Sequence, residues 1–190
     1  MEKAAAKVYG NYKLLDGGST EEGLRDLTGC QTEYHQWGQD EEEEVDVDDM
    51  WEKIQEYDER GFLIVAGTPG FDSYSETGAR PNSGGLTGGH AYSVIRAAEY
   101  EGHRLLNIRN PWGRTKEGQG SGEWTGDWSD QSELWDEVDG IKEELEPVFD
   151  QHDGNFWMAI EDFVTHFNDI GVCRVEPQFE CRLKGKFLKV

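Results

Sequence analysis

Glycine is the residue that most constrains how this chain can fold. There are 24 glycines among 190 residues, nearly twice the ordinary share of about 7%. They do not form one low-complexity tract but separate short apolar segments along the whole chain. Because glycine accepts the backbone conformations of tight turns, this spacing favours many turns between short strands. It does not fit the regular alternation of strands and helices of a doubly wound sheet.

Length and charge limit the class of protein. A chain of 190 residues can bury a real core in one domain, and seven tryptophans with 35% hydrophobic residues are too many for a disordered chain. The net charge of −22 argues against nucleic acid as a partner, because phosphate binding needs clustered cations. No run approaches the roughly 18 apolar residues of a transmembrane segment. The polar start also lacks a signal-peptide core, so we expect a cytoplasmic (intracellular) protein.

Local patterns predict an α+β fold with a mostly antiparallel sheet. Ser19 and Glu22 have the spacing of a capping box that opens a helix, and the apolar positions of residues 47–57 have helical periodicity. Segments 91–95 and 105–109 are strand-like and can pair as a hairpin. Further helices are expected at 2–9, 133–138, 142–145 and 161–167, and further strands at 62–66, 156–160 and 171–175.

Two segments are expected to lie in loops. Eight of the ten residues from Asp40 to Asp49 are acidic, and such a run repels itself and stays solvated. Residues 67–89 are rich in Gly, Ser, Thr, Asn and Pro. A loop of that length within a compact domain is uncommon unless it has a function.

His90 is the histidine with a special setting, since it follows Gly88-Gly89 and opens the strand predicted at 91–95. A general base needs an imidazole that is held rigidly and yet faces a cleft, and the start of an edge strand supplies both. The same position also suits a histidine that merely begins a strand. The local sequence leaves both interpretations open.

Asn110 lies 20 residues later, at the end of the strand that should pair with the one His90 begins. Because it precedes Pro111, its backbone is held out of the helical region and its amide can point back across the sheet. An amide oxygen that accepts from an imidazole N–H fixes the tautomer of the base, and Trp112 could shield that bond from water. Asn-Pro-Trp-Gly is equally compatible with a plain turn.

Three acidic residues, Glu123, Asp130 and Asp153, are interleaved with Trp and Gly. Flexible loops with carboxylate oxygens are what Ca²⁺ prefers in proteins. In a chain with 40 acidic residues, however, three such side chains can also be simply solvated.

Taken together, the motifs resemble the calpain family of calcium-dependent, papain-like cysteine proteases. The residues that carry the resemblance are Gly17–Leu24, Leu27–Gly29, Gly89–Val94, Ile108–Gly113, Glu123–Asp130 and Asp153–Met158. The resemblance implies that residues 1–177 form the second half of the split protease core, a papain-like half-domain. Residues 178–190 would then begin the linker to a following β-sandwich domain.

The resemblance also implies roles for the site residues. His90 would be the base that activates a thiol, Asn110 its orienting residue, and Trp112 the shield over both. The implied reaction is peptide-bond hydrolysis on protein substrates. The implied partner is the cysteine-bearing first half of the core, with which this half forms the substrate cleft.

A calcium ion is the cofactor that the resemblance implies. The matching side-chain ligands are Glu123, Asp130 and Asp153, and Gln151 stands near a position that contributes a backbone carbonyl. Asn155 departs from the family, which often has Glu at that position. One negative charge is thereby lost from the implied site.

The nucleophile of the family has no counterpart in this sequence. Cys30 is followed by Gln31 and stands where the family normally has Gly, while Cys173 and Cys181 follow the histidine instead of preceding it. Three cysteines without a CxxC pair also predict neither a disulfide framework nor a zinc site. We therefore expect this chain alone to be inactive. The alternative is a catalytically inactive, calpain-like chain that serves as a calcium-responsive or acidic interaction module.

Overall fold

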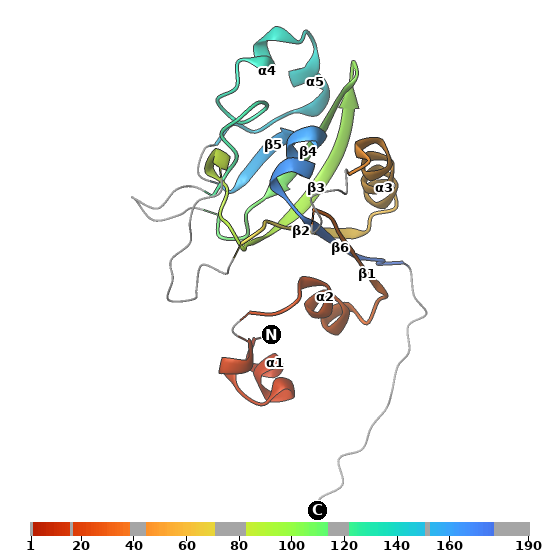
Figure 1. Cartoon of the computed structure of the whole chain (residues 1–190), viewed down its shortest axis with the longest axis vertical. Coiled ribbons are helices and arrows are strands. Elements are labelled where there is room, and N and C mark those ends of the chain that lie inside the picture. Colours follow the sequence, from red (N-terminus) through yellow and green to blue (C-terminus); the bar gives the residue numbers. More distant parts are fainter. Residues whose placement is uncertain are drawn as a thin grey trace, which may run out of the picture.

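The computed structural model describes residues 2–15, 17–38, 45–70, 83–113, 122–150 and 153–176. In these residues a six-stranded antiparallel sheet has the order β1-β6-β2-β3-β4-β5 (Figure 1). The strands are β1 (Thr32–Gln36), β2 (Leu63–Gly67), β3 (Ala91–Tyr100), β4 (His103–Arg109), β5 (Asn155–Ala159) and β6 (Asp169–Cys173). The predicted α+β fold with a mostly antiparallel sheet is therefore confirmed.

Helices surround this sheet at several points. They are α1 (Glu2–Tyr9), α2 (Thr20–Thr28), α3 (Val47–Glu59), α4 (Leu134–Glu137), α5 (Ile141–Leu145) and α6 (Ile160–His166), with 3₁₀ helices η1 (Tyr12–Leu15) and η2 (Ser83–Gly85). In the described part of the chain, no helix combines the length and the apolar character that crossing a membrane requires.

The predicted hairpin of β3 and β4 is present, with its turn at Glu101-Gly102. Both turn residues have positive φ, 48° and 84°, so a glycine in the second position avoids backbone strain. β3 runs five residues farther than the sequence pattern indicated, because pairing continues to Tyr100 opposite His103. The register shifts between Val94 and Arg96, where Ile95 forms a bulge. This hairpin brings the start of β3 close to the end of β4.

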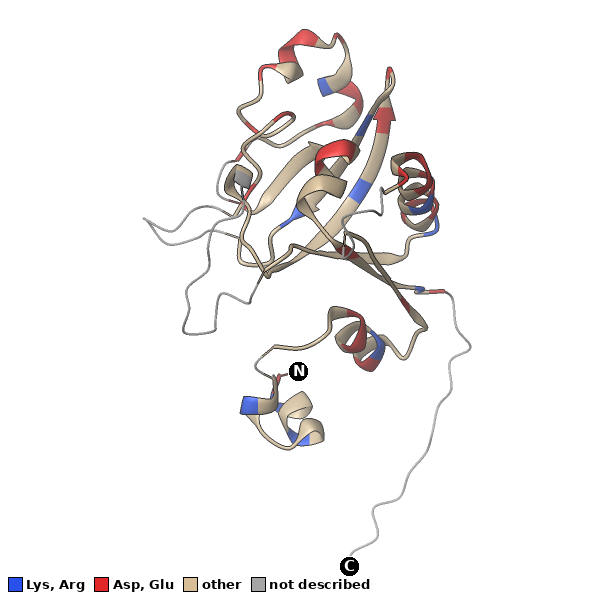
Figure 2. Cartoon of the chain, in the orientation of Figure 1, with Lys and Arg blue, Asp and Glu red and all other residues tan. Residues whose placement is uncertain are grey.

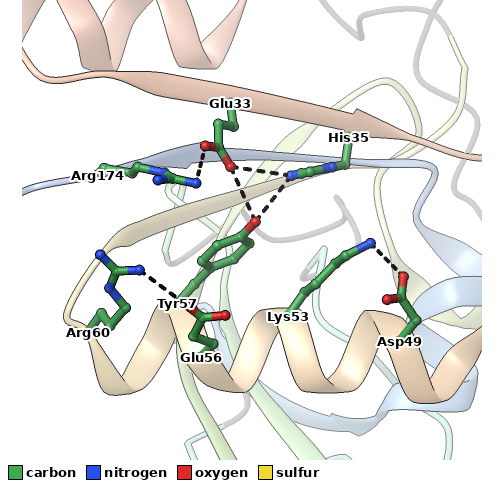
Figure 3. A network of polar contacts seen from close by, with 8 residues as sticks. All are labelled: Glu33, His35, Asp49, Lys53, Glu56, Tyr57, Arg60 and Arg174. Carbon is green, nitrogen blue, oxygen red and sulfur yellow. Dashed lines mark hydrogen bonds and ion pairs between the residues drawn. The ribbon is translucent and has the colours of Figure 1, made fainter.

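β1 is a strand that the sequence pattern did not reveal, because its residues, Thr-Glu-Tyr-His-Gln, lack an apolar alternation. Polar contacts instead tie it to α3 (Figure 3). The Tyr57 hydroxyl lies 3.3 Å from both Glu33 Oε2 and His35 Nε2, and Arg174, next to the end of β6, pairs with Glu33. Burial, together with the charge of Glu33, raises the pKa of Tyr57.

The sheet is packed on both faces. The larger core is formed by the sheet with α3 and α6, and the smaller core by the sheet with α4 and α5. Successive side chains along β5 point alternately into the two cores. Phe156 and Met158 point into the larger core, and Trp157 between them points into the smaller. Fully buried residues of β4 divide in the same way, with Leu106 and Ile108 on one side and Leu105 on the other. Such packing makes the central strands a rigid support for residues at their ends.

Two predicted helix starts are confirmed in detail. Ser19 caps α2 by accepting from the backbone N–H of Glu22 at 3.2 Å, and Gly29 ends that helix in the left-handed conformation. Asp46 caps α3 by accepting from Asp49 N. The end of the acidic run therefore forms a helix start and is not loop throughout, whereas residues 39–44 lie outside the described residues. Acidic residues are spread over many elements (Figure 2).

Candidate active site

His90 is fixed by backbone contacts on both sides of its Cα atom. Its backbone N–H donates to Thr68 Oγ1 at 3.0 Å, and its carbonyl accepts from the backbone N–H of Thr68 at 3.0 Å. Thr68 directly follows β2 and is buried. Gly89 has a φ of +59°, in the left-handed region, which explains the need for glycine before the histidine. The backbone of His90 is therefore held on both sides. The prediction that His90 opens an edge strand is wrong, because β3 pairs with β2 on one side and with β4 on the other.

Asn110 meets His90 as the hairpin suggested. The distance from His90 Nε2 to Asn110 Oδ1 is 2.9 Å, and Asn110 is completely buried. Trp112 N–H donates to the same oxygen at 3.0 Å. Because a backbone N–H can only donate, that atom must be the amide oxygen, and His90 Nε2 must therefore carry a proton. In the neutral imidazole Nδ1 is then the unprotonated nitrogen, the form that a general base requires.

Two aromatic rings hold the imidazole from different sides. The Trp112 ring lies over it, with ring centroids 4.1 Å apart, and Tyr92 contacts it edge-on at 5.0 Å. Trp112 is itself 38% exposed, so it covers the imidazole while presenting a surface of its own. Limited access of water strengthens the bond between His90 and Asn110.

Gly122 supports the candidate site, and the sequence reasoning did not single it out. Its carbonyl accepts from the Tyr92 hydroxyl at 3.0 Å and from Asn110 Nδ2 at 3.4 Å. A Cβ at this position would overlap Asn110 Nδ2, and the φ of +65° disfavours any side chain. The available signal was a glycine directly before the Glu123-Trp124 motif.

The three predicted acidic ligands lie close enough to influence one another. Glu123 is 5% exposed, and its Oε1 accepts from the backbone N–H of Gly154 at 2.8 Å. Asp153 Oδ1 accepts from the backbone N–H of Asn155 at 2.7 Å. Asp130 Oδ2 is buried and has no hydrogen-bond partner. Within the described residues, the Asp130 carboxylate is therefore only partly satisfied by the protein.

Burial and mutual repulsion change the acidity of this group. Burial, together with the charges of Asp130 and Asp153, raises the pKa of Glu123 to about 7. Burial and the charges of Asp153 and Asp150 raise the pKa of Asp130 to about 6. A nearby cation would relieve both effects.

The ligand chemistry suits a hard cation, although the ligands are not gathered into a finished site. Carboxylate oxygens, one of them buried without a partner, are the donors that Ca²⁺ selects. However, no group of three His, Cys, Asp or Glu side chains within the described ranges is close enough to hold a metal ion. Asn155 stands at the start of β5. Gln151 lies outside the described residues.

The candidate base and the acidic group share two backbone supports. Gly122, which holds Asn110, is followed directly by Glu123. Gly154, whose N–H binds Glu123, accepts from the backbone N–H of Asn110 at 2.8 Å. Any movement of Glu123 therefore affects residues that position Asn110.

Comparison with known proteins gives a consistent result. The model of the calpain family cysteine proteases matches residues 1–174. The chain is 38% identical over 180 residues to the calpain-type cysteine protease DEK1 of Arabidopsis thaliana, covering 94% of this chain and 8% of that protein. It is 35% identical over 185 residues to the calpain-2 catalytic subunit of Homo sapiens, covering 93% of this chain and 24% of that protein. The chain thus spans less than a quarter of the length of these relatives.

Proposed function

Because the chain belongs to the calpain family of cysteine proteases, we propose that it is the histidine- and asparagine-bearing half of a cysteine endopeptidase core. The observation that carries this proposal is the 2.9 Å contact between His90 Nε2 and Asn110 Oδ1, together with the Trp112 N–H that identifies the oxygen. This arrangement leaves Nδ1 as the basic nitrogen. A base held in one tautomer by an amide is what activation of a thiol requires.

In the proposed reaction, His90 removes the proton from a cysteine thiol and the thiolate attacks the carbonyl carbon of a peptide bond. The imidazolium then returns the proton to the leaving amine, which gives a thioester. In the second stage His90 takes a proton from water, the hydroxide attacks the thioester, and the thiol is released with its proton restored. Asn110 keeps the imidazole oriented throughout, and Trp112 keeps water away from their hydrogen bond.

We infer that the thiol comes from a separate, cysteine-bearing subdomain. Within the described ranges the cysteines are Cys30 and Cys173, and both are buried. The sulfur of Cys30 lies 3.7 Å from the Thr28 carbonyl oxygen, and that of Cys173 lies 3.3 Å from Thr28 Oγ1. Both sulfurs are thus engaged around the end of α2, whereas Cys181 lies outside the described residues.

Exposed apolar residues support a partner of this kind. In α1 and η1, Val8 is 82% exposed, Tyr12 56% and Leu14 61%, and α1 stands apart from the sheet (Figure 1). Trp112 adds an exposed indole beside the base. Clustered apolar surface of this sort is typical of protein interfaces.

We further propose that the acidic group binds a calcium ion. Glu123, Asp130 and Asp153 would supply carboxylate oxygens, with Gln151 and Asn155 as neighbouring oxygen donors. The bound ion would supply positive charge that offsets the repulsion between the carboxylates. Since Gly122 and Gly154 connect these residues to Asn110, ordering of the acidic group would stabilise the orientation of His90. An intracellular location, where calcium acts as a signal, is part of this proposal.

The test is reconstitution with a cysteine-bearing calpain first subdomain from the same protein. The 190-residue chain alone should not cleave casein or a peptide reporter at any calcium concentration. The combined halves should show calcium-dependent cleavage. Cleavage by this chain alone that is lost in Cys30→Ser would contradict the proposal, since the nucleophile would then lie within the chain. A serine or glycine in place of the cysteine in the natural partner would favour the inactive interaction module.

A further inference from the structure

An open hollow of about 260 Å³ adjoins the imidazole of His90. One wall is formed by Gly89, His90 and Ala91 at the start of β3. The opposite side is formed by the segment that opens α2, including Glu21, and by Tyr34 of β1. A substrate lying beside the base would therefore pass directly over this hollow.

Asp169 also lines the hollow. Gly67 of β2 pairs with Ala91 on one side and with Asp169 of β6 on the other. Because strands lie about 4.8 Å apart, Asp169 is about 10 Å from Ala91 across the sheet. The missing side chain of Gly67 leaves space that the Asp169 carboxylate enters, since a Cβ there would overlap that carboxylate.

The Asp169 carboxylate is oriented by groups that carry no positive charge. The Tyr34 hydroxyl and the backbone amide of Gly67 interact with it, and burial together with the charge of Glu21 raises its pKa. In the described part of the chain, no ion pair involves Asp169 or Glu21, and no Lys or Arg lines the hollow. Among the described lining residues, the carboxylates of Glu21 and Asp169 therefore face no Lys or Arg.

The rest of the lining does not favour an aliphatic ligand. Leu, Ile, Val and Met are absent from it, and the apolar surface comes from Ala91 and the Tyr34 ring. The α2 N-terminus contributes a partial positive charge, but the first-turn residues Glu21 and Glu22 offset it. The hollow offers a short apolar wall that ends at a carboxylate. Such a wall suits a side chain with an apolar stem and a cationic head.

On the basis of the proteolytic function proposed above, we propose that this hollow receives an arginine or lysine side chain of the substrate, with Asp169 as the residue that binds its positive head. Arginine should be preferred, because its planar guanidinium can donate two parallel hydrogen bonds to one carboxylate. The specificity of this protease is thus set by the strand β6 as well as by the residues that perform the chemistry.

The first test uses the reconstituted protease and peptide reporters that differ at one position. At the position that contacts the hollow, kcat/KM for arginine should exceed that for norleucine about tenfold or more. Asp169→Asn keeps the shape of the side chain and should abolish that preference. Asp162→Asn is the matched control, because Asp162 is another partly buried carboxylate with a raised pKa but lies in α6, away from the hollow. It should retain the preference.

The second test uses binding alone and needs no cysteine-bearing partner. Nα-acetyl-arginine methylamide, titrated into the ¹⁵N-labelled 190-residue chain, should shift the amide resonances of Gly67 and Ala91. Nα-acetyl-norleucine methylamide should bind the wild-type chain at least about tenfold more weakly. Nα-acetyl-arginine methylamide should bind the Asp169→Asn chain at least about tenfold more weakly. Gly67→Ala, which displaces the carboxylate without removing it, serves as a second variant if Asp169→Asn does not fold.

The two tests separate this inference from the proposed function. Cleavage that favours norleucine equally in the wild type and in Asp169→Asn would overturn the inference while the proteolytic function stands. Absence of cleavage by the combined halves would count against the proposed function. In that case arginine-specific shifts that require Asp169 would still support a cation-binding hollow, and equal shifts with norleucine would overturn it.

Discussion

The base and the acidic group lie side by side and are stabilised in opposite ways. His90, Asn110 and Trp112 form hydrogen bonds between neutral groups, and Asn110 is fully buried with its amide oxygen accepting twice. The neighbouring acidic group instead contains Asp130 Oδ2, a buried oxygen without a hydrogen-bond partner. The first site is already in the form its proposed chemistry needs. The second combines buried carboxylates with raised pKa values, and the proposed calcium ion would relieve their repulsion.

This contrast suggests that the two neighbouring groups have different roles. Hydrogen bonds within the fold set the position of the base, and in the proposed function calcium would act on it only indirectly. The segments that carry Glu123 and Asp153 contain the carboxylates that would respond to calcium if the proposed site exists. Their connection through Gly122 and Gly154 would let calcium tune the base without forming part of it.

Removal of the base should have the largest effect. His90→Ala in the reconstituted protease should lower kcat about 10³-fold, because a general base contributes about 10²–10⁴-fold. Asn110→Ala should lower kcat about 10²-fold, because the imidazole would lose its orientation. Both are measured as kcat on a peptide reporter at saturating calcium. Full activity of His90→Ala would mean that this histidine only opens a strand.

Substitution of Gly122 tests whether the residue that precedes Glu123 helps to position the base. Gly122→Ala should lower kcat about tenfold, because its Cβ would overlap Asn110 Nδ2 and displace the orienting amide. Gly102→Ala is the matched control, since Gly102 also has a positive φ, +84°, but a Cβ at that position would meet no atom within 4 Å. Both variants should lower the free energy of unfolding by a comparable amount. When both are fully folded, only Gly122→Ala should have a reduced kcat. Equal kcat values for Gly122→Ala and Gly102→Ala would show that Gly122 does not help to position the base.

The sequence was sufficient for the parts of the fold that follow local rules. The cap at Ser19, the hairpin turn at Gly102 and the approach of Asn110 to His90 depend on spacing and on turn chemistry, whereas the cap at Asp46 was not predicted. β1 could not be predicted in this way, because contacts between Glu33 and Tyr57 hold it, and they form only in the folded chain (Figure 3).

The candidate site was predictable to a similar degree. The motifs predicted which residues form the site, a prediction that stays to be tested, but the protonation of these residues did not follow from the motifs. The pKa of Glu123 depends on its burial and on the charges of nearby Asp130 and of Asp153, which comes from a separate segment of the chain. The hollow at Asp169 was missed for the same reason, since it needs β2, β3 and β6 to lie side by side.

The acidic group predicts how stability depends on pH without calcium. The folded pKa values of Glu123 and Asp130, about 7 and about 6, lie above their ordinary values. Between about pH 4 and pH 7 the folded chain therefore binds more protons than the unfolded chain, and stability falls as pH rises. The melting temperature should thus decrease between about pH 5 and pH 7.5, and Glu123→Gln should reduce that slope.

Calcium should oppose this loss of stability. A ligand that binds only the folded state stabilises it by about 2.7 kcal/mol at a hundredfold excess over Kd, and binding should release protons from Glu123 and Asp130. Magnesium should stabilise far less, because it demands octahedral geometry. Asp130→Ala should lose the calcium-specific rise in melting temperature and keep the magnesium response. An unchanged calcium response in Asp130→Ala would place calcium binding elsewhere.

The smallest expected effect comes from Asn155. It opens β5, and its backbone N–H already donates to Asp153 Oδ1, so a longer, charged side chain at this position lies next to the proposed ligands. Asn155→Glu should tighten calcium binding about tenfold, because each added carboxylate increases the charge attracting the ion. The same charge should lower the melting temperature in calcium-free buffer at neutral pH, since it adds to the repulsion around Glu123.

That opposite pair of effects distinguishes a ligand from added surface charge. Gln36→Glu is the matched control, because Gln36 is exposed in β1, at the opposite edge of the sheet from β5. It changes the net charge by the same amount and should leave the calcium affinity, measured by isothermal titration calorimetry, unchanged. If both variants bind calcium equally, the −22 net charge attracts the ion without a site at Asn155. If only Asn155→Glu binds more tightly, the start of β5 contributes to the site, and the acidic group differs from the rest of the charged surface by its position beside Asn110.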